Sequence, residues 1–550
     1  MKKFLFIILF FSFAIAANAQ LNLNVKAALN NLLRYGSGSE TVLGYTNPKE
    51  YFENVTDARL SVNDIVFGMR YEIDRPIEYG VNFQGIKKRY VEYNNNNIGI
   101  DFRAGDFWQV IGRGLSLNTF EDRGQFYDTG IDGVKFAYKK TFGDKKPVKI
   151  KGMFLGGRVL FNDYLVPTRV ETYDIRSGNF EISPIKNFNF GGNYVYSQGS
   201  IPNAFDTTAV KSYIPEGYGT FTLGNFQMFA SYAHKQTNTT PNNSYPVPLT
   251  AKGDGFYSSI SYSMPKIGFT LDYKNYRFDV TAPDYRGNDR PTRMLPFQNP
   301  PTAIKEHAST LLSRYPHVVD FNDEVGGQFD VVYAPTDKIT INLNTASASR
   351  HYDYKNIGTG ALIVYNRVER SSSYIMSFDD AFSPWYEAFL EGEWYASDKL
   401  YAKVAYDYQN SVIYDYLSPS NSEKQKINTI PAELRYTFTK NYTLKVGFEN
   451  QFLYNSAMTS KKDFMNQLLS LSVSKSPDLS ATVSYEWTTS EDEPTGKKAW
   501  LLGEVSYKLN TTNSVTVSYG TERGGIRCTN GICRYVRPFE GLRLTVNSKF

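Results

Sequence analysis

Apolar and polar residues alternate with a period of two along most of the chain. Residues 433–449 are a clear example, because large apolar side chains fall on one face and charged or small polar ones on the other. The apolar face consists of Leu434, Tyr436, Phe438, Tyr442, Leu444, Val446 and Phe448. The same division recurs in residues 339–343, 400–408, 479–487 and 515–519. Alternate side chains of an extended chain point to opposite faces, so the pattern predicts many two-faced β-strands.

Short turns join these segments in pairs, and each turn is rich in Gly, Pro, Asn, Asp or Ser. The turns lie at residues 94–97, 143–146, 184–187, 223–225, 264–266, 334–338, 396–399, 439–441, 474–478 and 509–513. Ten hairpins supply twenty strands. A leading strand near residues 58–73 and the terminal strand bring the expected number to about 22, within a range of 20–24.

Longer polar loops separate one hairpin from the next. They span residues 114–129, 199–212, 237–252, 281–323, 351–383, 412–428 and 523–535. Short turns at one end and long loops at the other are typical of outer-membrane barrels, and a crossing strand needs about 9–11 residues. The sequence therefore predicts an all-β fold, a transmembrane antiparallel up-and-down β-barrel with long extracellular loops.

The start of the chain has the pattern of a secretory signal peptide. A basic "MKK" precedes a short apolar run, and "ANA" before Gln20 matches a cleavage site. We expect a signal peptide over residues 1–19, an N-terminal periplasmic or lumen-associated segment over 20–57, and the barrel over 58–550. The predicted location is the outer membrane, and an even number of strands places both barrel ends on the periplasmic side.

Composition supports a membrane-facing surface. Aromatic residues make up 15% of the chain, with 42 Tyr and 38 Phe, as in the aromatic girdles of transmembrane barrels. A secreted all-β adhesin would share this composition and is the alternative that the strand pattern disfavours. The formal net charge of +5 is too small for a chain of 550 residues to indicate a nucleic-acid partner.

The chain ends in "GLRLTVNSKF", a patterned strand that continues to the last residue. Leu542, Leu544, Val546 and Phe550 lie on one face of it. Lipid offers no hydrogen-bond partner to an open sheet edge, so we expect this strand to close the barrel against the leading strand near residues 58–73. The terminal Phe resembles the signal that barrel-assembly machinery recognises. That machinery and outer-membrane lipids are the expected partners.

Two stretches carry a resemblance to a known group of proteins. Residues 104–122 ("AGDFWQVIGRGLSLNTFED") and 130–140 ("GIDGVKFAYKK") resemble a strand, outer loop and returning strand of porin-like channels. With "PPTAIKEHASTLLSRYPH" at 300–317, they make residues 58–550 similar to a family of uncharacterised porin-like outer-membrane barrels from Bacteroidota. The resemblance implies fold and location and brings no activity.

A barrel of this size also resembles TonB-dependent transporters, whose lumen holds a plug. The segment expected before the barrel, residues 20–57, is much shorter than the folded plug domain of that family. We therefore do not expect plug-type energised transport from this chain alone.

The predicted loops contain the few residues that suggest chemistry. Cys528 and Cys533 lie in the last long loop, and in an oxidising compartment we expect them to form a disulfide. Arg113, between two glycines, is a candidate constriction residue.

The stretch "TAIKEHASTLLSRY" at 302–315 has the spacing of a helix that packs into or over the barrel mouth. It adds Glu306, His307 and Arg314 as possible constriction or lumen residues, and a metal or substrate site there is the less favoured interpretation.

The leading functional hypothesis is a porin-like channel for passive or selective passage of small solutes, narrowed by loops 114–129, 281–323 and 351–383. The alternative is a loop-sealed barrel that acts as a scaffold for outer-membrane or surface protein partners. Catalysis is disfavoured, because the chain has only four histidines, His234, His307, His317 and His351. We expect no enzyme, no metal and no cofactor.

Overall fold

The computed structural model describes residues 24–550 except 43, 79, 144–146, 163–168, 203–205, 243–247, 280–293, 360–361, 363, 371 and 530. The predicted signal peptide, residues 1–19, lies outside the described residues. Among the described residues, no helix has the length and apolarity needed to cross a bilayer.

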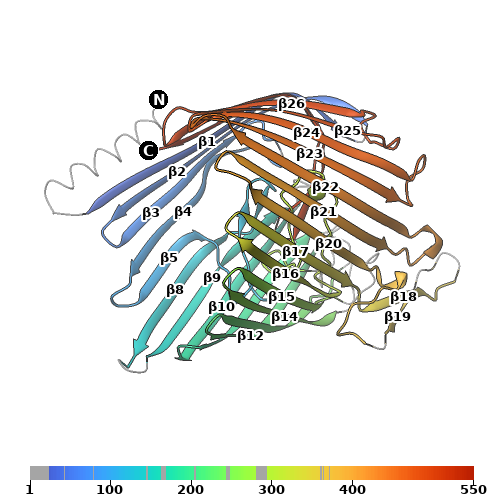
Figure 1. The fold of residues 1–550 in the computed structure, drawn as a ribbon. Coiled ribbons are helices and arrows are strands. Elements are labelled where there is room, and N and C mark those ends of the chain that lie inside the picture. The colour runs from blue at the N-terminus through green and yellow to red at the C-terminus, as the bar shows by residue number, and fades with distance from the viewer. Residues whose placement is uncertain are drawn as a thin grey trace.

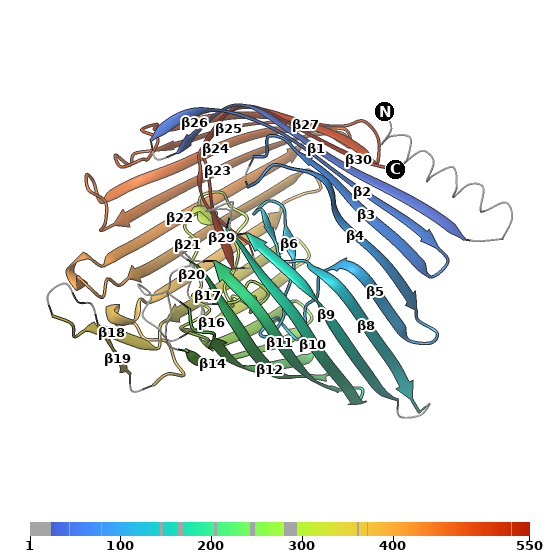
Figure 2. The ribbon, with the colours of Figure 1, turned by 180° about the vertical axis from the view of Figure 1, so that it is seen from behind.

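Twenty-four described strands form one closed antiparallel sheet, which Figures 1 and 2 show from opposite sides. Each strand pairs with its neighbours in the chain, and β27 and β1 both pair with β30, which closes the cylinder. The fold is thus a transmembrane up-and-down β-barrel, as predicted.

The barrel strands are β1 (Val25–Val42), β2 (Tyr45–Val62), β3 (Ile65–Asp74), β4 (Phe83–Asn95), β5 (Ile100–Phe107), β8 (Ile131–Phe142), β9 (Val148–Asn162), β10 (Val170–Ile185), β11 (Phe188–Pro202), β12 (Thr207–Leu223), β13 (Phe226–Thr239), β14 (Thr250–Met264), β15 (Ile267–Arg277), β16 (Glu324–Thr336), β17 (Ile339–Ser349), β20 (Trp385–Tyr395), β21 (Leu400–Ile413), β22 (Glu423–Thr437), β23 (Tyr442–Asn455), β24 (Asp463–Lys475), β25 (Leu479–Thr488), β26 (Ala499–Lys508), β27 (Asn513–Glu522) and β30 (Phe539–Lys549).

The described parts of the loops hold three small hairpins and three 3₁₀ turns. The hairpins pair β6 (Glu121–Asp122) with β7 (Tyr127–Asp128), β18 (Tyr352–Asn356) with β19 (Tyr365–Glu369), and β28 (Gly525–Thr529) with β29 (Ile532–Val536). The 3₁₀ turns are η2 (Leu312–Arg314), η3 (Asp380–Phe382) and η4 (Pro419–Asn421).

The predicted turns all fall between paired strands. The turn at 143–146 lies mostly outside the described residues, although Phe142 and Val148 on either side of it pair. An eleventh short turn, Asn63-Asp64, joins β2 to β3 and was not predicted. The leading strand expected near 58–73 therefore combines the end of β2 with most of β3, which is one reason why the count is 24 rather than 22.

The predicted N-terminal segment over 20–57 is wrong, because the barrel begins at Val25. Residues 25–62 form β1 and β2, the two longest strands of the described wall. The stretch "YGSGSE" looks like a linker, yet its glycines allow close packing. A Cβ on Gly36 would lie 2.1 Å from the Tyr51 ring, and one on Gly38 would lie 2.0 Å from the carbonyl oxygen of Glu540.

The terminal strand closes the barrel, but against β1 instead of residues 58–73. Residues 30–40 of β1 pair with residues 539–549 of β30. The last residue takes part, since Leu29 and Phe550 exchange backbone hydrogen bonds of 3.0 and 2.8 Å. The chain is thus ordered into the wall up to its final residue, and the assembly-signal role of Phe550 stays a prediction.

The outer surface carries the apolar faces predicted from the sequence. Leu434, Tyr436 and Phe448 are exposed on it, as are Phe154 and Val404 on other strands. A belt of exposed aliphatic and aromatic side chains suits contact with lipid. The polar faces of the same strands line the lumen.

Several expected loops are shorter than predicted because the strands are longer. β11 and β12 extend to Pro202 and from Thr207, so most of the loop expected at 199–212 is strand. A crossing strand needs about 9–11 residues, and the additional length continues the sheet beyond the bilayer at the long-loop end. Polar residues at the long-loop end therefore mark where a strand leaves the bilayer and meets water. They do not mark where its backbone pairing with the neighbouring strand ends.

Candidate functional site

Three loops fold from the long-loop end into the barrel lumen. Inner loop 1 is residues 108–130, inner loop 2 is residues 278–323 and inner loop 3 is residues 523–538. Their described parts bury the inward faces of the strands in the half of the lumen nearest the long loops, which we call the outer half. The half nearest the short turns is called the short-turn half.

Inner loop 1 is anchored to the wall by buried polar contacts. The carboxylate of Glu216 on β12 accepts hydrogen bonds from the Ser116 amide, at 3.2 Å, and from the Ser116 hydroxyl. Asn193 on β11 donates to the same hydroxyl at 2.9 Å. Lys88 on β4 pairs with Asp128 at 2.6 Å. The loop therefore contacts strands far apart around the wall.

Inner loops 1 and 2 are joined by backbone-directed hydrogen bonds. Asn118 donates to the carbonyl of Asn299 at 2.9 Å, and Gln298 donates to the carbonyl of Leu115 at 2.9 Å. The Tyr127 hydroxyl donates to Pro296 at 2.8 Å. Apolar side chains pack between the two loops and the wall, including the fully buried Leu115, Leu117 and Phe297.

Inner loop 2 reaches strands on both sides of the lumen. Phe297 packs edge-to-face on Tyr173 of β10, with ring centroids 5.6 Å apart. Farther along the loop, Glu449 on β23 accepts the amides of Thr310 and Leu311 at 3.0 and 2.7 Å. The described part of the loop thus crosses the lumen.

The helix predicted over 302–315 is wrong, since only the short turn η2 forms there. Side chains of the wall satisfy the backbone groups that a helix would pair internally. Gln451, for example, donates to the carbonyl of Leu311 at 3.1 Å. Contacts with the wall have overridden local helix propensity.

Two arginines meet two glutamates where inner loops 2 and 3 approach β25. Arg314 pairs with Glu486, and Arg523 pairs with Glu486 and Glu493 at 3.0 and 2.8 Å. Arg314 also donates to the carbonyl of Gly524 at 2.6 Å. Burial opposes the charge on Arg523, but the carboxylates of Glu493 and Glu486 outweigh it and raise the pKa of Arg523.

A second buried charge pair contacts inner loop 2 at two points. Lys274 on β15 is fully buried, pairs with Glu324 on β16, and donates to the carbonyl of Thr302 at 2.6 Å. The His317 ring bonds Glu324 at 3.0 Å and stacks on Trp385 with centroids 4.5 Å apart. Removing one partner from such a group leaves an uncompensated buried charge.

The three inner loops and the wall line a partly open cavity of about 520 Å³. Its walls are mostly aromatic, aliphatic and backbone groups, with two arginines. The lining residues are Gly124, Gln125, Phe126, Tyr127, Phe161, Met294, Leu295, Pro296, Gln298, Asn299, Val319, Phe321, Gly531, Ile532, Cys533, Arg534, Tyr535, Val536 and Arg537. This size is in the range of small-molecule sites.

The structure places the four candidate lumen residues in different surroundings. His307 bonds Glu387 at 2.9 Å and Arg314 joins the arginine–glutamate group, so both contact the wall. Arg113 stacks on Phe229, 4.7 Å from the ring centroid, but stays exposed. Glu306 is exposed as well. Cys528 and Cys533 are joined in a disulfide across the β28–β29 hairpin.

The long loop predicted at 351–383 is placed differently from the inner loops. Its β18–β19 hairpin packs Tyr352 and Tyr354 against Tyr416 of the β21–β22 loop. Figure 1 shows this hairpin projecting from the end of the barrel. The described part of the hairpin thus packs on another outer loop.

Each histidine is hydrogen-bonded to a carboxylate. The partners are Asp254 for His234, Glu387 for His307, Glu324 for His317 and Asp323 for His351. Within the described residues, no serine hydroxyl is among the hydrogen-bond partners of these rings. The expectation of no enzyme stays a prediction.

The fold and the inner loops together define the class: a large transmembrane β-barrel whose own loops enter the lumen. Comparison with family models assigns it more narrowly. The chain belongs to the family of unknown function DUF6029, whose model matches residues 1–550. A comparison with curated proteins finds no match.

Solved structures with a similar fold are outer-membrane receptors and transporters. The siderophore receptor PirA from Pseudomonas aeruginosa is 8% identical, with a TM-score of 0.43, over 96% of this chain and 80% of that one. The copper transporter OprC is 11% identical, with a TM-score of 0.42 and the same coverage. The FrpB iron transporter from Neisseria meningitidis is 10% identical, with a TM-score of 0.41, over 98% and 84%. Similarity at this level carries no argument about substrate.

Proposed function

We propose that this protein is a substrate-selective outer-membrane channel whose inner loops hold the outer half of the lumen closed and admit a small solute when they move. The observation that carries the proposal is the path of inner loop 2. It runs from contacts with β10 to contacts with β23 and β25. A segment in that position must move for a solute to pass.

The size of the barrel favours transport. Barrels of 16–18 strands leave an aqueous channel, and those of 22 strands enclose a plug that fills the lumen. Here 24 strands surround loops that belong to the same chain. Both barrel ends lie at the short-turn end, where Phe550 bonds Leu29, and we place that end in the periplasm.

The contacts that hold the inner loops are reversible. They are hydrogen bonds, ion pairs and packed apolar side chains, and each polar contact gives only about 1–3 kcal/mol net. The cavity of about 520 Å³ between the loops gives the selected solute a binding place on the path. This supports passage of small solutes by displacement of the loops instead of free diffusion through an open pore.

Conductance of the purified protein in planar bilayers tests the proposal. The wild type should show low or intermittent conductance. Replacing residues 296–317 with a short Gly-Ser linker should raise it several-fold. The matched control removes residues 355–366 of the β18–β19 hairpin, which keeps the hydrogen bond of Tyr354 to Asp323, and should leave conductance unchanged. An open, steady wild-type pore that the 296–317 deletion does not alter would refute the proposal.

The scaffold function predicted as the alternative stays a prediction, as do the partners named with it. Purification from the native membrane in mild detergent distinguishes a channel from a scaffold. A scaffold should retain a partner protein in a fixed ratio, and a channel should not.

A further inference from the structure

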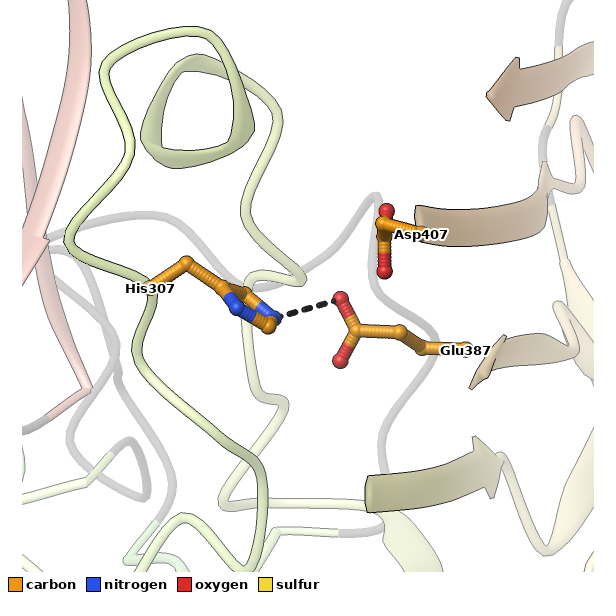
Figure 3. Close-up of side chains that lie close together, drawn as sticks. All are labelled: His307, Glu387 and Asp407. Carbon is orange, nitrogen blue, oxygen red and sulfur yellow. Dashed lines mark hydrogen bonds and ion pairs between the residues drawn. The ribbon is translucent and has the colours of Figure 1, made fainter. Parts of the chain in front are cut away.

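His307, Glu387 and Asp407 converge in the lumen from three separate elements. Glu387 and Asp407 lie on the inward faces of the neighbouring strands β20 and β21, and His307 reaches them from inner loop 2 (Figure 3). One nitrogen or oxygen from each side chain lies within 4.8 Å of the other two. Asp407 is fully buried and Glu387 is 4% exposed.

Most acceptor atoms of this cluster have no hydrogen-bond partner. One carboxylate oxygen of Glu387 is hydrogen-bonded to both His307, at 2.9 Å, and Gln409, at 2.8 Å. Its other oxygen and both oxygens of Asp407 are buried without a hydrogen bond. Unpaired buried carboxylates are strongly disfavoured, and two side by side repel each other.

The surrounding residues do not neutralise the two carboxylates. Within the described chain, no lysine or arginine forms an ion pair with Glu387 or Asp407. The nearby Lys305 lies over the Phe389 ring, 5.4 Å from its centroid, and pairs with Asp330 at 3.3 Å. The His307 ring bonds Glu387 at 2.9 Å, and a cation bound beside it can compensate both carboxylates.

The donor set matches a transition-metal cation. Zn²⁺ takes an imidazole nitrogen and carboxylate oxygens at about 2.0–2.2 Å, which places tetrahedral donors about 3.3 Å apart. His307 and Glu387 are already within that separation, and a carboxylate oxygen of Asp407 lies within 4.8 Å of both donor atoms. Ca²⁺ and Mg²⁺ prefer all-oxygen sites, so the imidazole selects against them.

We propose that His307, Glu387 and Asp407 bind one divalent transition-metal cation of the Zn²⁺ type. The cation joins inner loop 2 to the wall at β20 and β21 and leaves one coordination position for water or solute. Bound metal therefore holds the loop in the lumen, and removal of the metal loosens it. The proposed metal site does not depend on the proposed channel function, so its test remains valid if the barrel does not conduct.

Calorimetric titration of the full-length protein with Zn²⁺, together with metal analysis, tests the site. The protein carries no polyhistidine tag and is first stripped with a chelator. We expect about one Zn²⁺ per chain and more than about 10-fold weaker binding in Asp407→Asn and in Glu387→Gln. The matched control is His234→Gln, which alters a half-exposed histidine–carboxylate pair between β13 and β14 and should bind like the wild type. Ca²⁺ should bind at least tenfold more weakly.

Zinc X-ray absorption of the wild type gives a test that needs no variant. One imidazole among oxygen donors supports the site, and two or more imidazoles place the zinc elsewhere and overturn the proposal. Binding that is the same in wild type and in the Asp407→Asn and Glu387→Gln variants also overturns it. No binding at all overturns the proposal as well.

Discussion

The outer and short-turn halves of the lumen are lined by the same strands but differ in what covers them. On β23, Gln451 and Leu453 in the outer half are almost completely buried, whereas Lys445 in the short-turn half is exposed. On β26, Trp500 is buried and both Glu504 and Lys508 are exposed. Polar side chains bind loops in one half and are left to water in the other.

Inward polar residues look the same in the sequence but have two different roles in the barrel. In the outer half such residues satisfy the backbone and the charges of the inner loops, as Glu449 and Glu486 do. In the short-turn half they are exposed to water, as Lys445 and Glu504 are. The same substitution should therefore have very different effects in the two halves.

The largest effect is expected from Glu486→Gln, which removes the shared partner of Arg314 and Arg523. Breaking a buried ion pair costs about 3–5 kcal/mol. Hydrogen exchange of the amides in residues 308–316 should therefore become at least about 100-fold faster. The control, Glu504→Gln, lies on the exposed lining and should change exchange less than about threefold. Equal effects of the two variants would remove the distinction between the halves.

A smaller effect is expected from Leu312→Ala in inner loop 2. Leu312 is 2% exposed and packs against Phe389 and Ala405 of the wall. A buried Leu→Ala change costs about 2–5 kcal/mol, and a site whose surroundings can collapse around the cavity falls at the low end. Limited proteolysis should cut inner loop 2 at least tenfold faster. Val318→Ala, at an exposed position of the same loop, should leave cleavage unchanged.

The smallest effect is expected from removing the disulfide with Cys528→Ser and Cys533→Ser together. Removing a disulfide that closes a loop of this length lowers the stability of the folded hairpin by about 2 kcal/mol. Because the β28–β29 hairpin keeps its backbone pairing, exchange should rise within residues 525–536 and stay unchanged at 308–316. Faster exchange in inner loop 2 would mean that the three inner loops open as one unit.

Much of the barrel could be predicted because its signal is local. The period of two and the short turns depend on residues that are neighbours in sequence, and these elements are where they were expected. β1 was missed because "ALNNLL" and "GSGS" interrupt the alternation. Its strand form depends on Tyr51 and on backbone 500 residues away, which no local pattern reports.

The candidate site was less predictable because loops create it. Alternation placed Asp407 and Glu486 on the inward face but could not indicate which half would be covered. It gave no reason to select Lys274 or Glu216, whose importance depends on contacts with Thr302 and Ser116 far along the chain. The helix expected at 302–315 failed for the same reason, since Glu449 and Gln451 bind its backbone.

Cysteine accessibility along β23 tests directly whether the inner loops close the outer half of the lumen. The two native cysteines are bonded to each other, so Gln451→Cys and Lys445→Cys each introduce a single thiol on the same inward face. In the folded protein, a bulky water-soluble maleimide should modify Lys445→Cys rapidly and Gln451→Cys at least 100-fold more slowly. Equal modification rates would contradict a lumen that its own loops close in the outer half.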